Sequence, residues 1–171
     1  MRDLLVVTAD PENPQRGRLT YAGRSYPCVL GRAGISTSKR EGDGATPVGR
    51  FPLRRVLYRA DKLPAPQTQL PVGIIGRTDG WCDAPDDALY NRPVTLPYPA
   101  SAENMWRDDA LYDVVVVIGH NDDPVVPAAG SAIFMHVAGH EPTAGCIAFS
   151  REDLLDILAR LLPGADIDIR A

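Results

Sequence analysis

The segment from residue 134 to residue 149, FMHVAGHEPTAGCIAF, gathers side chains that could do chemistry. It holds His136, His140 and Cys146, in a chain that has only three histidines and three cysteines. Cys146 follows a Pro-Thr-Ala-Gly stretch typical of a turn and precedes a short apolar run. Three interpretations are open: a nucleophile with its base, a metal site, or an ordinary strand and turn that contain reactive residues.

Cys146 and His136 have a spacing that suits a nucleophile and its base. His136 lies ten residues before Cys146 (146 − 136), which allows the chain to turn back and bring the imidazole beside the sulfur. A paired histidine lowers the pKa of a thiol, so this interpretation predicts a thiol that reacts readily near neutral pH. Gly145 permits an unusual φ, and the amides of the turn can then form an oxyanion hole.

The two other interpretations of the segment are weaker but remain open on the residues alone. His136, His140 and Cys146 are legitimate zinc ligands, yet Gly139 interrupts a helical presentation and no paired ligand spacing accompanies them. We therefore expect no metal. A lone cysteine is most often a small buried hydrophobe, and a histidine in an apolar strand is often a core residue.

Composition and charge limit the classes of function. The 171 residues fit one domain, and the net charge of −4 argues against nucleic acid as a partner. Residues 31–62 carry eight basic and three acidic side chains, which suits either a wall that attracts carboxylates or a solvated face. The glycine-rich loop at residues 42–49 lacks the Lys-Ser/Thr ending of a phosphate loop, so we expect no nucleotide or other cofactor.

The hydrophobic patterns predict a mostly β fold with one helix near the C-terminus. Strands are expected at 3–9, 51–58, 113–120, 131–139, 147–149 and 165–170, with a hairpin around an Ala-Gly-Arg-Ser turn at 22–25. The run of valines at 114–117 is apolar throughout, which predicts a strand buried on both faces. Ser150 is a candidate N-cap for a helix that ends at Pro163-Gly164.

Residues 63–112 form a long insertion without a strong period. Its tryptophans and tyrosines favour order, since disordered segments are poor in aromatic residues. The apolar run at residues 4–7 is too short for a signal peptide, and no stretch approaches the length needed to span a bilayer. We expect a single domain over residues 1–171 that is monomeric.

Two separated motifs, GDGATPVGRF and IFMHVAGHEPTAGCIAFS, resemble those of the YkuD-type L,D-transpeptidases, bacterial cell-wall enzymes. The resemblance covers about residues 42–150 and implies a YkuD-like β-sandwich or barrel. It also implies that Cys146 is the nucleophile and His136 the base. Thr143 matches the Ser/Thr of the signature, and Gly145 together with the Cys146 amide matches the oxyanion-hole positions.

Two departures from the family pattern occur beside Cys146. Ala144 stands where most members have a second histidine, and the spacer from His136 to Cys146 is shorter than usual. The insertion also resembles a minor branch of the family, in which the cross-link starts at the first stem residue and joins L-Ala to diaminopimelate. The alternatives are an L,D-carboxypeptidase that hydrolyses the same thioester and a catalytically silent cell-wall binding module.

The resemblance implies peptidoglycan stem peptides as donor and acceptor, and hence a periplasmic location. Thr143 and Ala144 are then expected beside the substrate, and an arginine, Arg50 foremost, with Arg40 and Arg54 as further candidates, beside a stem carboxylate. His120, at the end of a buried strand, is a candidate for orienting substrate. Trp81 in the insertion is expected over the site, and Cys82 beside it is either a lining residue or an incidental buried thiol.

Overall fold

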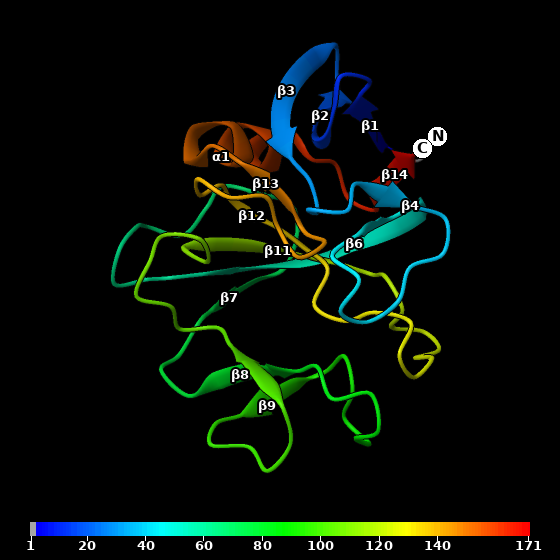
Figure 1. The fold of residues 1–171 in the computed structure, drawn as a ribbon. Helices are drawn as coiled ribbons and strands as arrows, with labels where there is room; N and C mark the ends of the chain where they lie inside the picture. The colour runs from blue at the N-terminus through cyan, green and yellow to red at the C-terminus, as the bar shows by residue number, and fades with distance from the viewer. Residues whose placement is uncertain (1–2) are drawn as a thin grey trace.

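The structure is a computed structural model that describes residues 3–171, and strands dominate it (Figure 1). This described part contains fourteen strands and one helix, so the mostly β fold class is confirmed. Eight strands belong to the main sheet and close on themselves: β1 (Leu4–Asp10), β2 (Asn13–Tyr21), β3 (Arg24–Val29), β6 (Gly49–Tyr58), β11 (Val114–Ile118), β12 (Phe134–Val137), β13 (Ile147–Phe149) and β14 (Asp166–Arg170).

The strand order β11-β12-β13-β3-β2-β1-β14-β6 becomes a barrel because β6 also pairs with β11. The long strand β6 makes this closure possible: its first half pairs with β14 and its second half with β11. A further strand, β7 (Val72–Ile74), adds to β6 in parallel. β12 and β13 are also parallel, and this pairing places the chemically active segment.

Strand β11 separates two hydrophobic clusters. Val114 and Val116 point into the barrel core, whereas Val115 and Val117 point into a second cluster on the outer face. Both faces of the strand are therefore covered, which is why its sequence is apolar throughout and does not alternate. The prediction of a doubly buried strand is confirmed, since every residue of β11 is buried.

The helix α1 (Arg151–Arg160) follows β13 without a linker beyond its cap. The Ser150 hydroxyl accepts a hydrogen bond from the Asp153 amide at 3.1 Å, as expected of an N-cap. Leu154, Ile157 and Leu158 are fully buried in the barrel core, where α1 packs against β12 and β13. The helix thus anchors the strand that begins one residue after Cys146.

The hairpin between β2 and β3 has a tighter turn than the sequence predicted. Only Ala22 and Gly23 form it, with φ of 49° and 74°, and Arg24 already pairs with Tyr21. A two-residue turn in which both residues have positive φ matches the right-handed twist of the flanking strands. The two strands are therefore joined without the four-residue turn that the sequence predicted.

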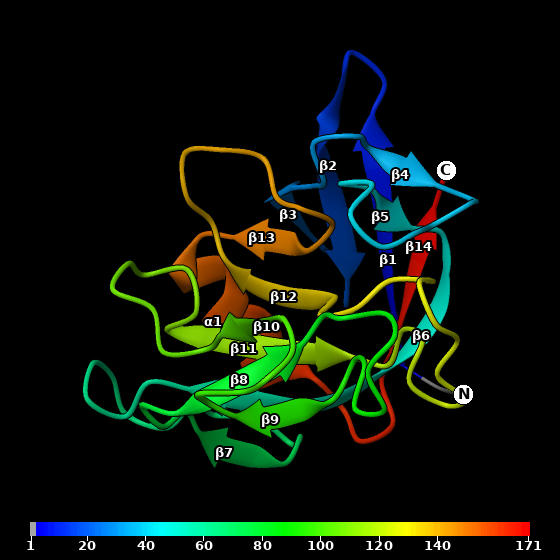
Figure 2. The same ribbon diagram turned by 60° about the horizontal axis from the view of Figure 1, so that its bottom comes forward.

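Residues 63–112 are ordered and form a small second sheet beside the barrel. Besides β7, they contain β8 (Asp79–Cys82), β9 (Pro93–Thr95) and β10 (Ala102–Asn104), paired in the order β10-β8-β9. Trp81, Met105 and Tyr112 bury their side chains in the second cluster, against Phe134 of β12. Figure 1 shows β8 and β9 below the barrel, and Figure 2 brings this sheet in front of it.

A short parallel pair, β4 (Ile35–Ser36) and β5 (Thr46–Pro47), brackets the glycine-rich loop ahead of β6. No helix within residues 3–171 has the length and apolar character needed to cross a membrane.

Candidate active site

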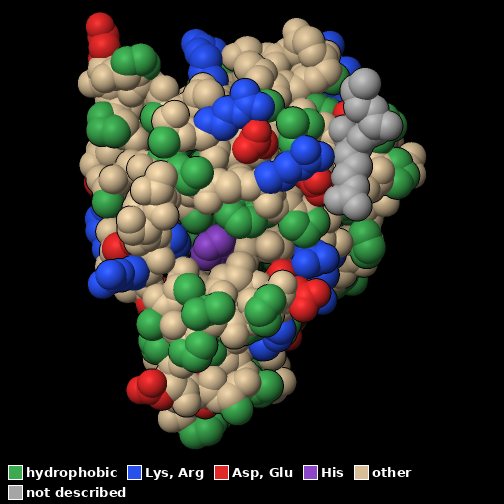
Figure 3. Space-filling view, turned by 90° about the vertical axis from the view of Figure 1, so that its right-hand side faces the viewer, with side chains coloured by type: hydrophobic (Ala, Val, Ile, Leu, Met, Phe, Trp, Pro, Cys, Tyr) green, Lys and Arg blue, Asp and Glu red, His purple; other side chains and the backbone are tan. Residues whose placement is uncertain are grey.

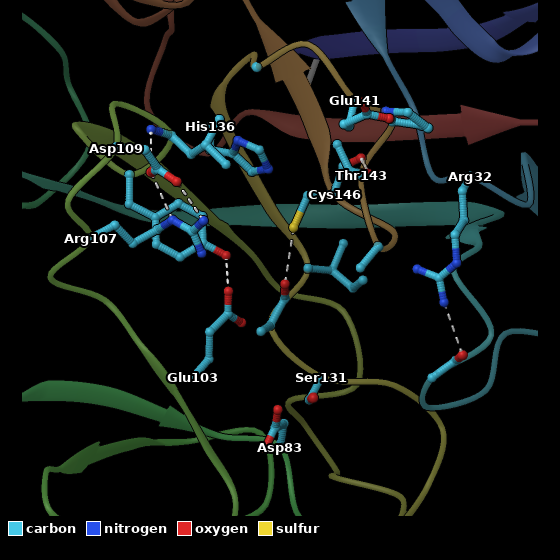
Figure 4. A pocket seen from close by; sticks show the side chains of 18 of the residues that line it. Arg32, Asp83, Glu103, Arg107, Asp109, Ser131, His136, Glu141, Thr143 and Cys146 are labelled. Carbon is cyan, nitrogen blue, oxygen red and sulfur yellow. Dashed lines mark hydrogen bonds and ion pairs between the residues drawn. The ribbon is translucent and has the colours of Figure 1, made fainter.

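Strands β12 and β13 bring His136 and Cys146 to the same face of the barrel wall. His136 pairs with Ala148, and Cys146 directly precedes β13, two positions before Ala148. Alternate residues of a strand share a face, so the two side chains point the same way, with Cα atoms about 8 Å apart by strand geometry. Both side chains line one cavity (Figure 4).

The Cys146 thiol is held by the chain that leads into β12. Its Sγ donates to the Ala132 carbonyl oxygen at 3.2 Å and accepts from the Phe134 amide at 3.4 Å. Burial, together with a smaller contribution from the nearby Glu103 carboxyl, raises the pKa of the thiol to about 12. The resting side chain is therefore a neutral thiol.

The His136 imidazole is oriented by backbone and by an aromatic ring. Nδ1 lies 2.8 Å from the Val137 carbonyl oxygen, so this nitrogen carries the proton and Nε2 keeps its lone pair. The Tyr112 ring packs edge-on against the imidazole, with centroids 5.3 Å apart. Burial lowers the pKa of His136 to about 4, which keeps the ring neutral at neutral pH.

These two pKa shifts correct the expectation of a thiol that ionises readily. The sequence shows that a histidine is close enough to pair, but it does not show that both groups are buried. Desolvation disfavours each charged form, and for Cys146 it outweighs any lowering by a neutral imidazole. Both groups are therefore neutral at rest, and the recorded hydrogen bonds of the Cys146 sulfur are to the backbone of residues 132 and 134.

Thr143 ties together the turn that precedes Cys146. Its Oγ1 donates to the Cys146 carbonyl oxygen at 2.6 Å and accepts from the Gly145 amide at 3.1 Å. Its backbone bonds in both directions to residues 30 and 32, at 3.0 and 2.9 Å. Both hydrogen bonds of the Thr143 hydroxyl are therefore made within the turn, and they hold the backbone of Gly145 and Cys146 in place.

Gly145 is required by its conformation and by close packing. Its φ is +139°, and an added Cβ would lie 2.7 Å from the Ala45 carbonyl oxygen. Ala45 belongs to the glycine-rich loop, so the two sequence motifs meet at this contact. Since the Gly145 amide is bound to Thr143, the Cys146 amide, which has no hydrogen-bond acceptor among residues 3–171, is the donor left for an oxyanion.

The cavity in front of Cys146 has a volume of about 820 Å³ and is open to solvent. The barrel contributes one wall and the segment 83–112 the other, so the insertion does fold over this site. The space-filling view shows a histidine between the main body and the lower lobe, on the face that this view presents (Figure 3). The charged side chains that line the cavity are Arg32, Lys39, Glu41, Asp83, Glu103, Arg107, Asp109 and Glu141.

Several residues expected at the substrate do not line this cavity. Arg50 forms an ion pair with Asp166 at 2.9 Å on the β6–β14 pair and is not among the lining residues. Arg54 is likewise paired with Asp122 at 2.9 Å, and Arg40 is not among the lining residues. The basic side chains that the fold brings to the cavity are instead Arg32, Lys39 and Arg107.

The remaining expected residues divide between the cavity and the layer behind it. Ala144 is exposed and lines the cavity. Trp81 packs edge-on against Phe134, with ring centroids 5.0 Å apart, and neither residue lines the cavity. His120 stacks edge-on against Phe51 and does not line the cavity, and Cys82 is fully buried.

The described residues contain no group of three or more His, Cys, Asp or Glu side chains that could hold a metal ion. His140 is exposed, whereas His136 is turned to the Val137 carbonyl. Both histidines are among the residues that line the cavity with Cys146.

Sequence reasoning missed the polar residues that the insertion contributes. Glu103 accepts a hydrogen bond from the Tyr112 hydroxyl, and Arg107 pairs with Asp109 at 2.6 Å while lying over the Tyr112 ring at 5.3 Å. The segment AENMWRDDALY carries no periodicity that would assign its side chains to a face. Its density of charged and aromatic residues was the one available signal.

The site and the barrel together raise the question of kinship with known proteins. A family model for the YkuD L,D-transpeptidase catalytic domain matches residues 7–169. The chain belongs to this family. The resemblance identified from the two motifs is thus confirmed, over nearly the whole chain.

One solved structure is similar to this chain. L,D-transpeptidase 1 of Mycobacterium tuberculosis is 14% identical, with a TM-score of 0.40. The match covers 98% of this chain and 62% of that protein, so this chain spans less than two thirds of the length of that protein. No match was found among curated proteins.

Proposed function

We propose that this protein is an L,D-transpeptidase that transfers an acyl group between peptidoglycan stem peptides, with Cys146 as nucleophile and His136 as base. One observation carries the proposal: Cys146 and the imidazole of His136 face the same cavity from adjacent parallel strands, with Nδ1 fixed by a carbonyl so that Nε2 is the basic nitrogen. Membership of the family supports the reaction class. The reaction needs no cofactor in this scheme.

Acylation begins when a donor stem places the carbonyl of an L-configured residue beside the Cys146 sulfur. As the sulfur bonds to that carbon, the thiol proton moves to Nε2 of His136, so no free thiolate has to exist in the buried site. The Cys146 amide donates to the carbonyl oxygen as it becomes an oxyanion. Collapse expels the amine, which takes its proton from His136, and a thioester remains.

Transfer completes the cycle when an acceptor amine, the side-chain amine of diaminopimelate in our proposal, attacks the thioester. The new amide bond forms, the C–S bond breaks, and the sulfur regains a proton through His136. Water in place of the amine yields a carboxypeptidase from the same intermediate. The exposed Ala144 and the wall formed by the insertion support donor cleavage at the first stem residue and hence 1,3 cross-links, with the protein acting in the periplasm.

The decisive experiment follows the thioester by mass. Incubation with purified muropeptides should add the mass of the donor acyl group to the wild-type protein, and cross-linked dimers should accumulate. Cys146→Ala should abolish both signals, whereas Cys28→Ala, which removes a buried thiol from β3 outside the cavity, should retain them. The mass of the adduct reads out the donor position directly.

Three outcomes would contradict parts of the proposal. Cross-linking by Cys146→Ala would remove this residue from the mechanism. Binding of muropeptides without any adduct would favour the silent cell-wall binding module. An adduct that is released only as free acid would make the protein a carboxypeptidase.

A further inference from the structure

In the transfer step the acceptor ammonium must lose two protons, and His136 alone can accept only one of them. A primary amine has a pKa of about 10.4 and reaches the site as an ammonium ion. Aminolysis of the thioester by an ammonium ion gives an amide, a thiol and one further proton. His136 delivers one proton to the sulfur, and the second needs another acceptor. With a pKa of about 4, His136 is a weak base toward a cation.

Glu103 is placed to receive that ammonium. It lines the same cavity as Cys146 and His136, and it accepts a hydrogen bond from the hydroxyl of Tyr112. The Tyr112 ring contacts the imidazole of His136, so Glu103 is connected to the base through one side chain. Figure 4 shows Glu103 on the side of the cavity away from Glu141.

The charge around Glu103 favours a cation. Five carboxylates and three basic side chains line the cavity, and Asp109 is neutralised by Arg107. Glu103 forms no ion pair with any of residues 3–171. Asp83 faces it from the neighbouring strand, diagonal to it in the β8–β10 register, and Asp83 Oδ1 is buried without a hydrogen-bond partner among the described residues.

We propose that Glu103, assisted by Asp83, binds the ammonium group of the acceptor and takes the proton that makes the amine a nucleophile. The inference rests on the proposed function, because it concerns the second half of that reaction. One proton moves from nitrogen to the Glu103 carboxylate, and the nitrogen bonds to the thioester carbon. The nitrogen gives its second proton to Nε2 of His136, and the C–S bond breaks as His136 passes that proton to the sulfur. Glu103 then returns its proton to solvent through the open cavity.

Burial also suits Glu103 to this task as a base. Its pKa is raised, chiefly by burial, against the opposing effect of the Tyr112 hydrogen bond. A carboxylate with a raised pKa is a stronger base than one in water. Hydrolysis does not require a base that binds and deprotonates an ammonium ion, because the attacking water is uncharged. Glu103 thus increases the fraction of the thioester that reacts with the acceptor amine, relative to the fraction that reacts with water.

The test measures that partition in Glu103→Gln. Gln keeps the size of Glu and an oxygen that can accept from Tyr112, so the fold should be retained. With one donor and increasing acceptor, the ratio of cross-linked to hydrolysed product should fall by at least about 10-fold, the lower range for loss of an acid–base group. Glu141→Gln removes the same charge from the other side of the cavity and should leave the ratio unchanged.

A neutral nucleophile separates deprotonation from mere shaping of the cavity. Hydroxylamine is uncharged at neutral pH, so its transfer by Glu103→Gln should stay within about 2-fold of wild type while transfer to the ammonium acceptor falls. Equal losses for both nucleophiles, or an unchanged product ratio, would overturn the inference. Absence of any thioester in the wild-type protein would instead overturn the proposed function, so the two failures are distinguishable.

Discussion

Burial of the neutral His136 imidazole should make the protein lose stability as the pH falls below neutral. The pKa of His136 is about 4 in the folded protein and 6.5 in an exposed histidine. Between these values the unfolded chain binds a proton that the folded protein does not, so protonation favours unfolding. One pKa unit is worth about 1.4 kcal/mol, so the loss is about 2 kcal/mol at pH 5 and about 3 kcal/mol at pH 4.

The perturbation is His136→Asn, which removes the titration. An Asn amide can replace the Nδ1–H donor to the Val137 carbonyl, so the variant should remain folded. Urea unfolding at pH 7 and pH 5 gives the change in free energy of unfolding for each protein. The wild type should lose about 2 kcal/mol more than the variant over this interval. His140→Asn, at an exposed position, is the matched control and should not alter the loss.

Comparison of variants is essential, because other groups also titrate. Burial likewise lowers the pKa of His120 to about 4, so it adds a loss of the same sign. Glu103, with a raised pKa, contributes in the opposite direction, since its stabilising effect is lost as the pH rises. These contributions cancel between wild type and His136→Asn. Equal losses in the two proteins would refute the argument that His136 is buried and neutral.

Three further predictions concern the turn and the thiol. Thr143→Val leaves the Gly145 amide and the Cys146 carbonyl without the hydroxyl, and it should lower the free energy of unfolding by about 1–3 kcal/mol and reduce turnover, as urea unfolding and cross-linking assays will measure. Gly145→Ala forces a Cβ to 2.7 Å from the Ala45 carbonyl oxygen, so thermal unfolding should show a lower melting temperature, and an unchanged value would contradict this packing. Cys146, with a pKa of about 12, should be alkylated by iodoacetamide at pH 7.5 at least about 100-fold more slowly than a small free thiol, and rapid alkylation detected by mass would indicate a resting thiolate.

The sequence alone determined the elements whose signals are local. The Ser150 cap, the apolar stripe of the helix and the continuous run of β11 predict their own structures, since each depends on neighbours within a few residues. The two motifs also identified the family and the pair of Cys146 and His136 as candidates. Gly145 was predicted to need an unusual φ, and its φ of +139° confirms this.

Only the tertiary structure decided which charged groups surround that pair and in what ionisation state they rest. Arg50 was a reasonable candidate for binding a carboxylate, but the pairing of β6 with β14 gives it Asp166 as a partner. Glu103 reaches the cavity because its strand pairs with β8 in the small sheet. This pairing joins segments about 20 residues apart, and no hydrophobic period in the sequence predicts it. Burial likewise depends on contacts distant in sequence, and for that reason the neutral state of Cys146 and His136 could not be predicted from their spacing.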